Sequence, residues 1–113
     1  MNSLDLTFAA LADPTRRAIL ARLTAGETTV GELAAPFSIS GPAISRHLRV
    51  LEAAALITSR RDRQHRRCAL VPGAMASAAE WIVSQQHFWN GSFDKLEVHL
   101  TNMRGKPDVD GLK

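Results

Sequence analysis

The chain has 113 residues and one cysteine, which suffices for one domain with a modest core and excludes an internal disulfide. Hydrophobic residues make up 45% and charged residues 22%, as in ordinary soluble proteins, and no apolar run approaches the ~20 residues of a membrane-spanning helix. The formal net charge is +3 and the amino-terminal residues show no secretory signal, so we expect a basic, cytoplasmic protein without a membrane partner.

Two short helices are predicted first. Apolar residues at positions i, i+4 and i+7 indicate a helix that ends near Ala12, namely Leu4, Phe8 and Leu11. Asp13 is then a good N-cap, and Pro14 occupies the first turn of the second helix, where a missing N–H is harmless. Gly26 is expected to close this helix. Its core face is predicted to carry Ala18, Ile19, Leu20 and Leu23, with Arg16, Arg17 and Arg22 outside.

The next two helices form a predicted helix-turn-helix, the first of them beginning at Thr28 or Thr29 and running to Phe37. After only two residues, Ser40 caps a fourth helix that runs to about Ala54. Its apolar stripe consists of Ile44, Leu48 and Leu51. The opposite face offers small, hydroxyl, guanidinium and imidazole groups, which fit the major groove of DNA. The candidate DNA contacts there are Ser40, Pro42, Ala43, Ser45, Arg46, His47 and Arg49.

A basic hairpin is predicted directly after this helix. Residues 56–61 and 67–71 favour strands, and the polar residues 62–66 would join them as a loop. Between Arg46 and Arg67 the chain has seven arginines against two acids, a local balance of +5. A helix-turn-helix followed by such a hairpin indicates a winged helix whose wing arginines hold DNA phosphates. These arginines are Arg60, Arg61, Arg63, Arg66 and Arg67. The alternative is a solvated hairpin whose charges protect edge strands, although five arginines in eight residues exceed that need.

A long helix is predicted from residue 74 to about residue 100, and one face of it is rich in aromatic side chains. A chain of this length has few other residues that could cover this face. We therefore expect a second subunit to cover it, in an interface that also includes the first helix. The expected dimer interface comprises Leu4, Phe8, Trp81, Phe88, Trp89, Phe93 and Leu96. The alternative is that the aromatic residues fold back on their own core. Residues 1–102 would thus form the DNA-binding and dimerisation domain, and residues 103–113 a disordered tail.

Three segments of the chain occur together in a known pattern: LADPTRRAIL at 11–20, VGELA at 30–34 and the capped helix over 40–51. With them the chain resembles the ArsR/SmtB family of bacterial transcriptional regulators. The resemblance implies a mostly α winged helix-turn-helix that dimerises through its terminal helices. It also implies a homodimeric repressor on a palindromic double-stranded DNA operator, with helix 40–54 in the major groove and wing 60–67 on the flanking backbone.

Metal-sensing members of that family carry ligand spacings that this chain lacks. The third helix has no Cys-x-Cys pair, and the last helix has neither an Asp-x-His nor a His-x-x-Glu pair. The last helix does offer His87, Asp94, Glu97 and His99, but a closed zinc site needs about four ligands at tetrahedral geometry. The sequence therefore predicts no metal site and no cofactor, and the last helix resembles that of metal-independent members.

Two other functions remain as alternatives. A metal- or thiol-responsive repressor of the same fold is one, with Cys68 beside Arg66 and Arg67 as the thiol, because nearby cations lower the pKa of a thiol. An enzyme is the other, but Ser45 and His47 lie two positions apart on a helix and face different ways. With no other set of nucleophile and base, the sequence predicts that the chain is not an enzyme.

The chain departs from the pattern of the family that it resembles at two turns. Ala55 stands where many members have a glycine after the fourth helix, and if the site requires a positive φ, alanine carries about 1 kcal/mol of strain. The wing tip also lacks the usual glycine, so the sequence leaves its turn type open.

Overall fold

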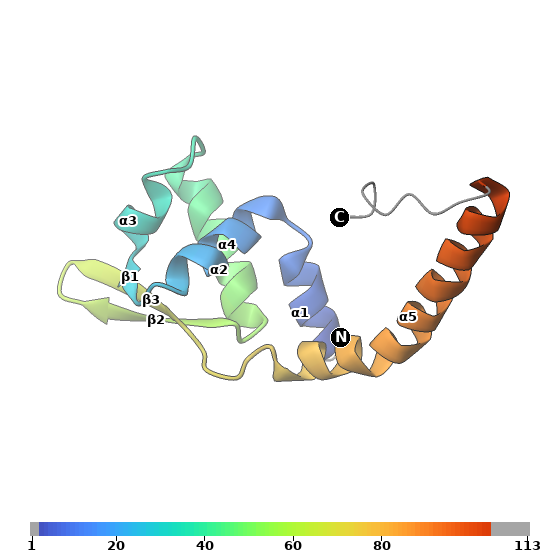
Figure 1. Ribbon diagram of the computed structural model, residues 1–113. Helices are drawn as coiled ribbons and strands as arrows, with labels where there is room; N and C mark the ends of the chain where they lie inside the picture. Colours follow the sequence, from blue (N-terminus) through green and yellow to red (C-terminus); the bar gives the residue numbers. More distant parts are fainter. Residues whose placement is uncertain (1–2, 105–113) are drawn as a thin grey trace. The chain divides into compact units, whose positions relative to one another are not determined.

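The structure is a computed structural model that describes residues 3–104, including the side chains of residues 3–91 and 99–101 (Figure 1). The chain divides into two compact units, Met1–Ala78 and Ala79–Lys113, and each is described by itself. The elements in chain order are α1 (Ser3–Leu11), α2 (Pro14–Leu23), β1 (Thr28–Thr29), α3 (Val30–Ala34), α4 (Gly41–Ala53), β2 (Ile57–Asp62), β3 (His65–Leu70) and α5 (Ala76–Arg104).

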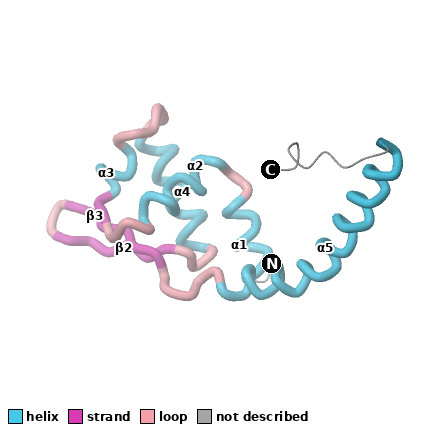
Figure 2. The backbone as a smooth tube through the Cα atoms, in the orientation of Figure 1, coloured by secondary structure: helices cyan, strands magenta, loops and turns pink. Residues whose placement is uncertain are grey.

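The first unit is a winged helix-turn-helix in which α1 to α4 gather beside a small antiparallel sheet (Figure 2). Its core is apolar and consists of side chains from both the helices and the sheet. The largest fully buried side chains are Ile19, Leu33, Ile44, Leu51, Leu56 and Cys68. The predicted mostly α fold with a small β element is therefore confirmed.

The start of α2 confirms the predicted capping. The backbone N–H of Arg16 donates to Asp13 Oδ2 at 2.9 Å, and Pro14 stands at the first helical position. That hydrogen bond favours the ionised carboxylate, so it holds the pKa of Asp13 below its ordinary value. Two details of α2 were predicted wrongly. Ala18 is exposed, and the side chain of Arg16 is partly buried against α1.

The turn of the helix-turn-helix is longer than predicted. The helix α3 ends at Ala34, with Ala35 as its C-cap, so residues 35–40 lie before α4. Ala35 keeps helical angles, with φ −53° and ψ −43°, and the helix stops at Pro36 because a proline has no N–H to continue the helical hydrogen bonds. At the other end of α3, Thr29 is the N-cap and its Oγ1 accepts from the N–H of Glu32.

The sheet has three strands in the order β1-β3-β2, one more than predicted. With only Thr28 and Thr29, β1 is too short for any alternation of polar and apolar residues, and its pairing with β3 is a tertiary contact. The hairpin is also tighter than predicted, because Asp62 pairs with His65 and leaves only Arg63 and Gln64 as the turn. Arg63 has a φ of 58°, so it takes the left-handed conformation that a tight hairpin turn requires.

The helix α4 ends in a Schellman motif built on an alanine. The N–H of Leu56 donates to the carbonyl of Leu51 at 3.0 Å, and the N–H of Ala55 donates to the carbonyl of Glu52 at 2.9 Å. Ala55 has a φ of 57°, the left-handed region that glycine adopts without penalty. The strain predicted at this position therefore follows from the observed backbone.

We expect Ala55→Gly to stabilise the protein by roughly 0.5–1 kcal/mol, since relief of left-handed strain outweighs the extra chain entropy of glycine. Urea unfolding at a fixed protein concentration measures the change. Ala53→Gly is the matched control, because Ala53 is helical and the same substitution there should destabilise by roughly 0.5–1 kcal/mol. A less stable Ala55→Gly protein would contradict the backbone strain that we assign to Ala55.

The second unit consists of the greater part of α5. Three aromatic side chains of this helix are largely exposed on the single chain, with 48% of Trp81, 66% of Phe88 and 52% of Trp89 accessible. The rings of Phe88 and Trp89 meet edge to face at a centroid distance of 5.4 Å.

Parts of the predictions for the carboxyl-terminal segment lie outside the described residues. Phe93 and Leu96 are among the residues whose side chains the structure does not describe. The predicted tail begins with Met103 and Arg104, the last residues of α5, and its remainder is not described. Among the described residues, no helix has both the length and the apolar character that crossing a bilayer requires.

Candidate nucleic-acid interface

The helix α4 is positioned by its cap and its apolar stripe, as predicted. Ser40 Oγ accepts from the N–H of Ala43 at 3.2 Å, and Pro42 lies in the first turn. Ile44, Leu48 and Leu51 are buried, which fixes the rotation of the helix about its axis. The opposite face is therefore turned to solvent. The candidate residues exposed there are Ser40, Pro42, Ser45, Arg46 and Arg49, while Ala43 and His47 are partly buried.

The strand register sorts the wing arginines onto two faces of the hairpin. Arg61 pairs with Arg66 and Ser59 pairs with Cys68, so these four side chains share one face. Ser59 Oγ donates to Glu52 Oε1 at 2.6 Å and accepts from Arg66 Nε at 3.1 Å. Because Glu52 belongs to α4, this is the face that continues the surface of the helix.

The other face of the hairpin carries arginines that are already paired with acids. Arg60 and Arg67 lie opposite each other in the register. Arg60 Nη2 donates to Glu27 Oε1 at 2.7 Å, and Arg67 Nε donates to Asp62 Oδ2 at 2.9 Å. These ion pairs offset part of the wing charge, so the five wing arginines are not equivalent.

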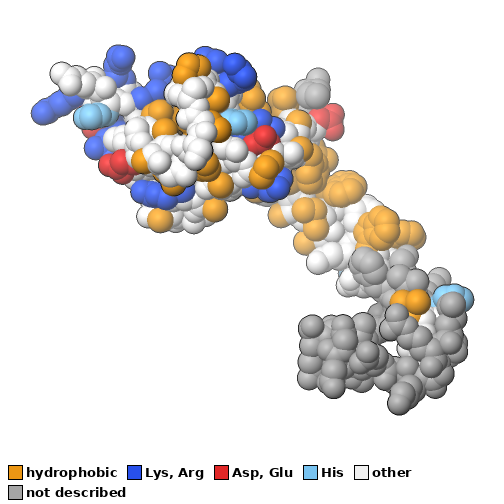
Figure 3. Space-filling model, turned by 90° about the horizontal axis from the view of Figure 1, so that it is seen from above, with side chains coloured by type: hydrophobic (Ala, Val, Ile, Leu, Met, Phe, Trp, Pro, Cys, Tyr) orange, Lys and Arg blue, Asp and Glu red, His pale blue; other side chains and the backbone are white. Residues whose placement is uncertain are grey.

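The remaining candidate arginines form the free positive charge of the surface. All four are exposed, and within the part of the chain that the structure describes none forms an ion pair with an acid. They are Arg46, Arg49, Arg61 and Arg63. Figure 3 shows arginine side chains spread over the first unit, including the end that carries the β2–β3 turn.

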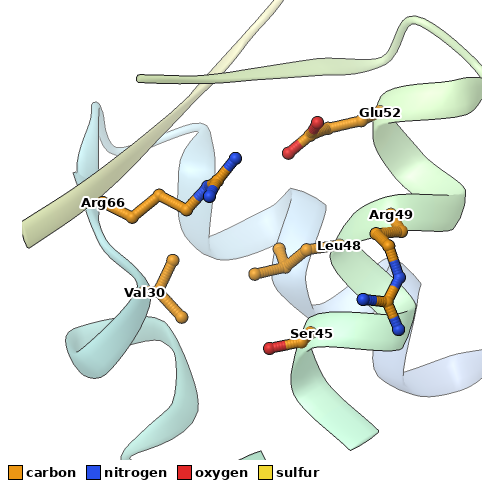
Figure 4. Close-up of a pocket in the computed structure, with 6 residues that line it drawn as sticks. All are labelled: Val30, Ser45, Leu48, Arg49, Glu52 and Arg66. Atoms are coloured by element: carbon orange, nitrogen blue, oxygen red, sulfur yellow. The ribbon is translucent and has the colours of Figure 1, made fainter. Parts of the chain in front are cut away.

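A groove of about 400 Å³ separates the helix from the wing. Arg66 enters it from β3 and Val30 from α3, and the other lining side chains come from α4 (Figure 4). These are Ser45, Leu48, Arg49 and Glu52. Helix and wing are thus the two walls of one groove, with a guanidinium on each wall, and they do not point apart.

His47 is held inside the protein more than the sequence indicated. Its Nδ1 lies 3.2 Å from Arg16 Nη1 and 3.8 Å from Asp13 Oδ2, and 21% of its side chain is exposed. The structure therefore brings His47 to α2. Sequence reasoning missed Arg16 as part of this site because a charged residue in the first turn of a helix is normally solvated.

Cys68 lies on the core side of β3 and is fully buried. Burial raises the pKa of its thiol, Glu52 adds to the rise, and the opposing effect of Arg66 is smaller. A buried, protonated thiol is a poor nucleophile, so the structure lends no support to a thiol switch. Among the described residues, no three histidine, cysteine or acidic side chains gather as metal ligands would.

Comparison with known proteins places the chain among bacterial regulators. A helix-turn-helix domain model matches residues 11–60. The chain is 45% identical over 73 residues to the HTH-type transcriptional regulator Rv2034 of Mycobacterium tuberculosis, covering 65% of this chain and 68% of that protein. It is 38% identical over 77 residues to the transcriptional repressor SdpR of Bacillus subtilis, covering 68% of this chain and 86% of the repressor.

A solved structure shows the same likeness in three dimensions. The crystal structure of the ArsR family transcriptional regulator RHA00566 matches with a TM-score of 0.73 and 38% identity. The match covers 79% of this chain and 98% of that one. The similarity therefore spans nearly the whole of the known regulator.

Proposed function

Since the chain belongs to the ArsR family of winged helix-turn-helix transcriptional regulators, we propose that it acts in the cytoplasm as a homodimeric repressor on a palindromic operator. It is a DNA-binding regulator and not an enzyme. The repressor SdpR, which is similar to this chain over most of its own length, supports repression over activation.

In this proposal α4 enters the major groove and reads base edges with Ser45 and Arg46. Arg46 donates two parallel hydrogen bonds to guanine O6 and N7 in this proposal. Arg49, Arg61 and Arg63 bind phosphates beside the major groove of the DNA. The observation that carries the proposal is the hydrogen-bonded chain from Arg66 through Ser59 to Glu52, because it holds wing and helix as one cationic surface.

The remaining candidates have smaller parts in this proposal. Ser40, Pro42 and Ala43 lie at the start of α4, at the edge of the major groove of the DNA, where small side chains allow a close approach. Arg60, Arg66 and Arg67 already have acceptors within the protein, so we assign them a lesser share of the phosphate contacts.

The homodimer is proposed from the aromatic face of α5. An exposed apolar face on a regulator of this size favours burial by a partner subunit. Phe93 and Leu96 extend this face in the sequence, and Leu4 and Phe8 of α1 are assigned to the same interface. A two-fold dimer presents two copies of α4, which matches an operator with two-fold symmetry.

Footprinting on the promoter of its own gene, followed by titrations at several salt concentrations, tests the proposal. We expect two protected half-sites about one helical turn apart. Arg49, Arg61 and Arg63 of both subunits would neutralise about six phosphates, so the affinity should fall about 10³-fold between about 50 and 200 mM salt. A single protected half-site, or an affinity that is insensitive to salt, would contradict it.

A further inference from the structure

The side chain of Arg16 connects the end of α1 to the proposed recognition helix. Its Nε donates to the carbonyl of Ala10 at 2.7 Å, and its Nη2 donates to the carbonyl of Ala9 at 3.1 Å. The third nitrogen, Nη1, lies 3.2 Å from His47 Nδ1 on α4. One planar group thus satisfies two carbonyls at the end of a helix and still reaches α4.

The contact with Arg16 determines which nitrogen of His47 carries the proton. A guanidinium has donors only, so His47 Nδ1 must accept the hydrogen bond. A neutral imidazole that accepts at Nδ1 carries its proton on Nε2. Asp13 favours the opposite tautomer, but its Oδ2 is 3.8 Å from Nδ1 and already accepts from the N–H of Arg16.

We propose that Arg16 is a positioning residue for DNA recognition, which holds His47 as the Nε2–H tautomer and so makes it a hydrogen-bond donor on α4. The DNA group that His47 reads is then an acceptor, such as guanine O6 or N7, thymine O4 or a phosphate oxygen. The DNA contact rests on the proposed function, whereas the tautomer is a property of the free protein.

The neighbouring residue Arg17 provides a matched control. Its Nη1 donates to the carbonyl of Leu11 at 2.6 Å, so it also serves the end of α1. Its hydrogen bond goes to α1 and not to His47. Arg16→Met and Arg17→Met therefore remove the same charge and side-chain hydrogen bonds to the end of α1, two for Arg16 and one for Arg17, and only Arg16→Met also removes a contact with His47.

Long-range ¹H–¹⁵N spectra of the histidine rings in the free protein test the tautomer. We expect Nε2–H for His47 in the unmodified protein, and this result needs no substitution. In Arg16→Met the proton should move towards Nδ1, where Asp13 can accept it, and Arg17→Met should leave the ring unchanged. Arg16→Gln, a milder change, should move it in the same direction and serves if the methionine variant fails to fold. An Nδ1–H tautomer in the unmodified protein, or no change in the Arg16 variants, would overturn the proposal.

Operator titrations of the full chain test the consequence for DNA. Arg16→Met should weaken operator binding about tenfold, about the combined effect of one weak hydrogen bond lost in each half-site, while Arg17→Met should change it less than about twofold. In a His47→Ala background, Arg16→Met should have no further effect. Losses that multiply in the double variant would show that Arg16 acts elsewhere and would overturn its positioning role. If the unmodified protein bound no promoter DNA, the proposed function would fail, but the tautomer assignment would stand on its own spectra.

Discussion

Replacing Arg46 with alanine is expected to weaken operator binding about 10–100-fold while changing the affinity for a random duplex by less than about threefold. Arg46 lies on the exposed face of α4, with no ion pair to an acid within the described residues. A bidentate contact with guanine discriminates by about 1–3 kcal/mol, and two such contacts near the lower end of that range, one in each half-site, correspond to this loss. Gel-shift titrations on both duplexes at one salt concentration measure it.

Arg63→Ala is the matched comparison for Arg46→Ala. Arg63 is exposed at the wing turn, and we assign it to a phosphate. Its loss should weaken binding to the operator and to a random duplex alike, and should reduce the salt slope by about 2, because the dimer loses one phosphate contact in each subunit. Alanine retains a Cβ as arginine does, so the left-handed turn at this position is strained to a similar degree in both proteins. Equal losses for both variants on both duplexes would contradict the division between base and phosphate contacts.

Replacing Phe88 with aspartate is expected to convert the dimer to a monomer and to weaken operator binding about 10²–10⁴-fold. A buried carboxylate in the aromatic face would have no partner, and without the dimer each half-site is bound separately. Sedimentation velocity measures the oligomeric state, and gel shifts measure the affinity. The substituted side chain is exposed on the single chain, so the fold of the first unit should be unaffected.

Val83→Asp is the control for the dimer prediction. Val83 is 58% exposed and lies on the same helix as Phe88. Phe88 follows Trp81 by seven positions and shares its face, whereas Val83 follows Trp81 by two positions and points the other way. We expect Val83→Asp to remain dimeric. A dimeric Phe88→Asp protein, or equal dissociation of both variants, would contradict the proposed interface.

Much of the fold of the first unit was predictable because its signals are local. Asp13 and Ser40 each cap a helix, and each is followed within two residues by a proline. The spacing of Ile44, Leu48 and Leu51 identifies the buried side of α4 without knowledge of its neighbours. The errors lay where a distant partner decides the conformation. β1 exists as a strand only through its pairing with β3, and the length of the wing turn follows from the pairing of Asp62 with His65.

The sequence by itself determined that a capped amphipathic helix and a block of arginines lie next to each other, since caps, spacing and charge are properties of neighbouring residues. Only the tertiary structure decided which of those charged groups are available. Arg16 meets His47 across 31 positions of the chain, and Arg60 meets Glu27 across 33. Such contacts depend on helix packing and strand register, so no local pattern encodes them. They determine which arginines are left to bind DNA and which nitrogen of His47 carries the proton.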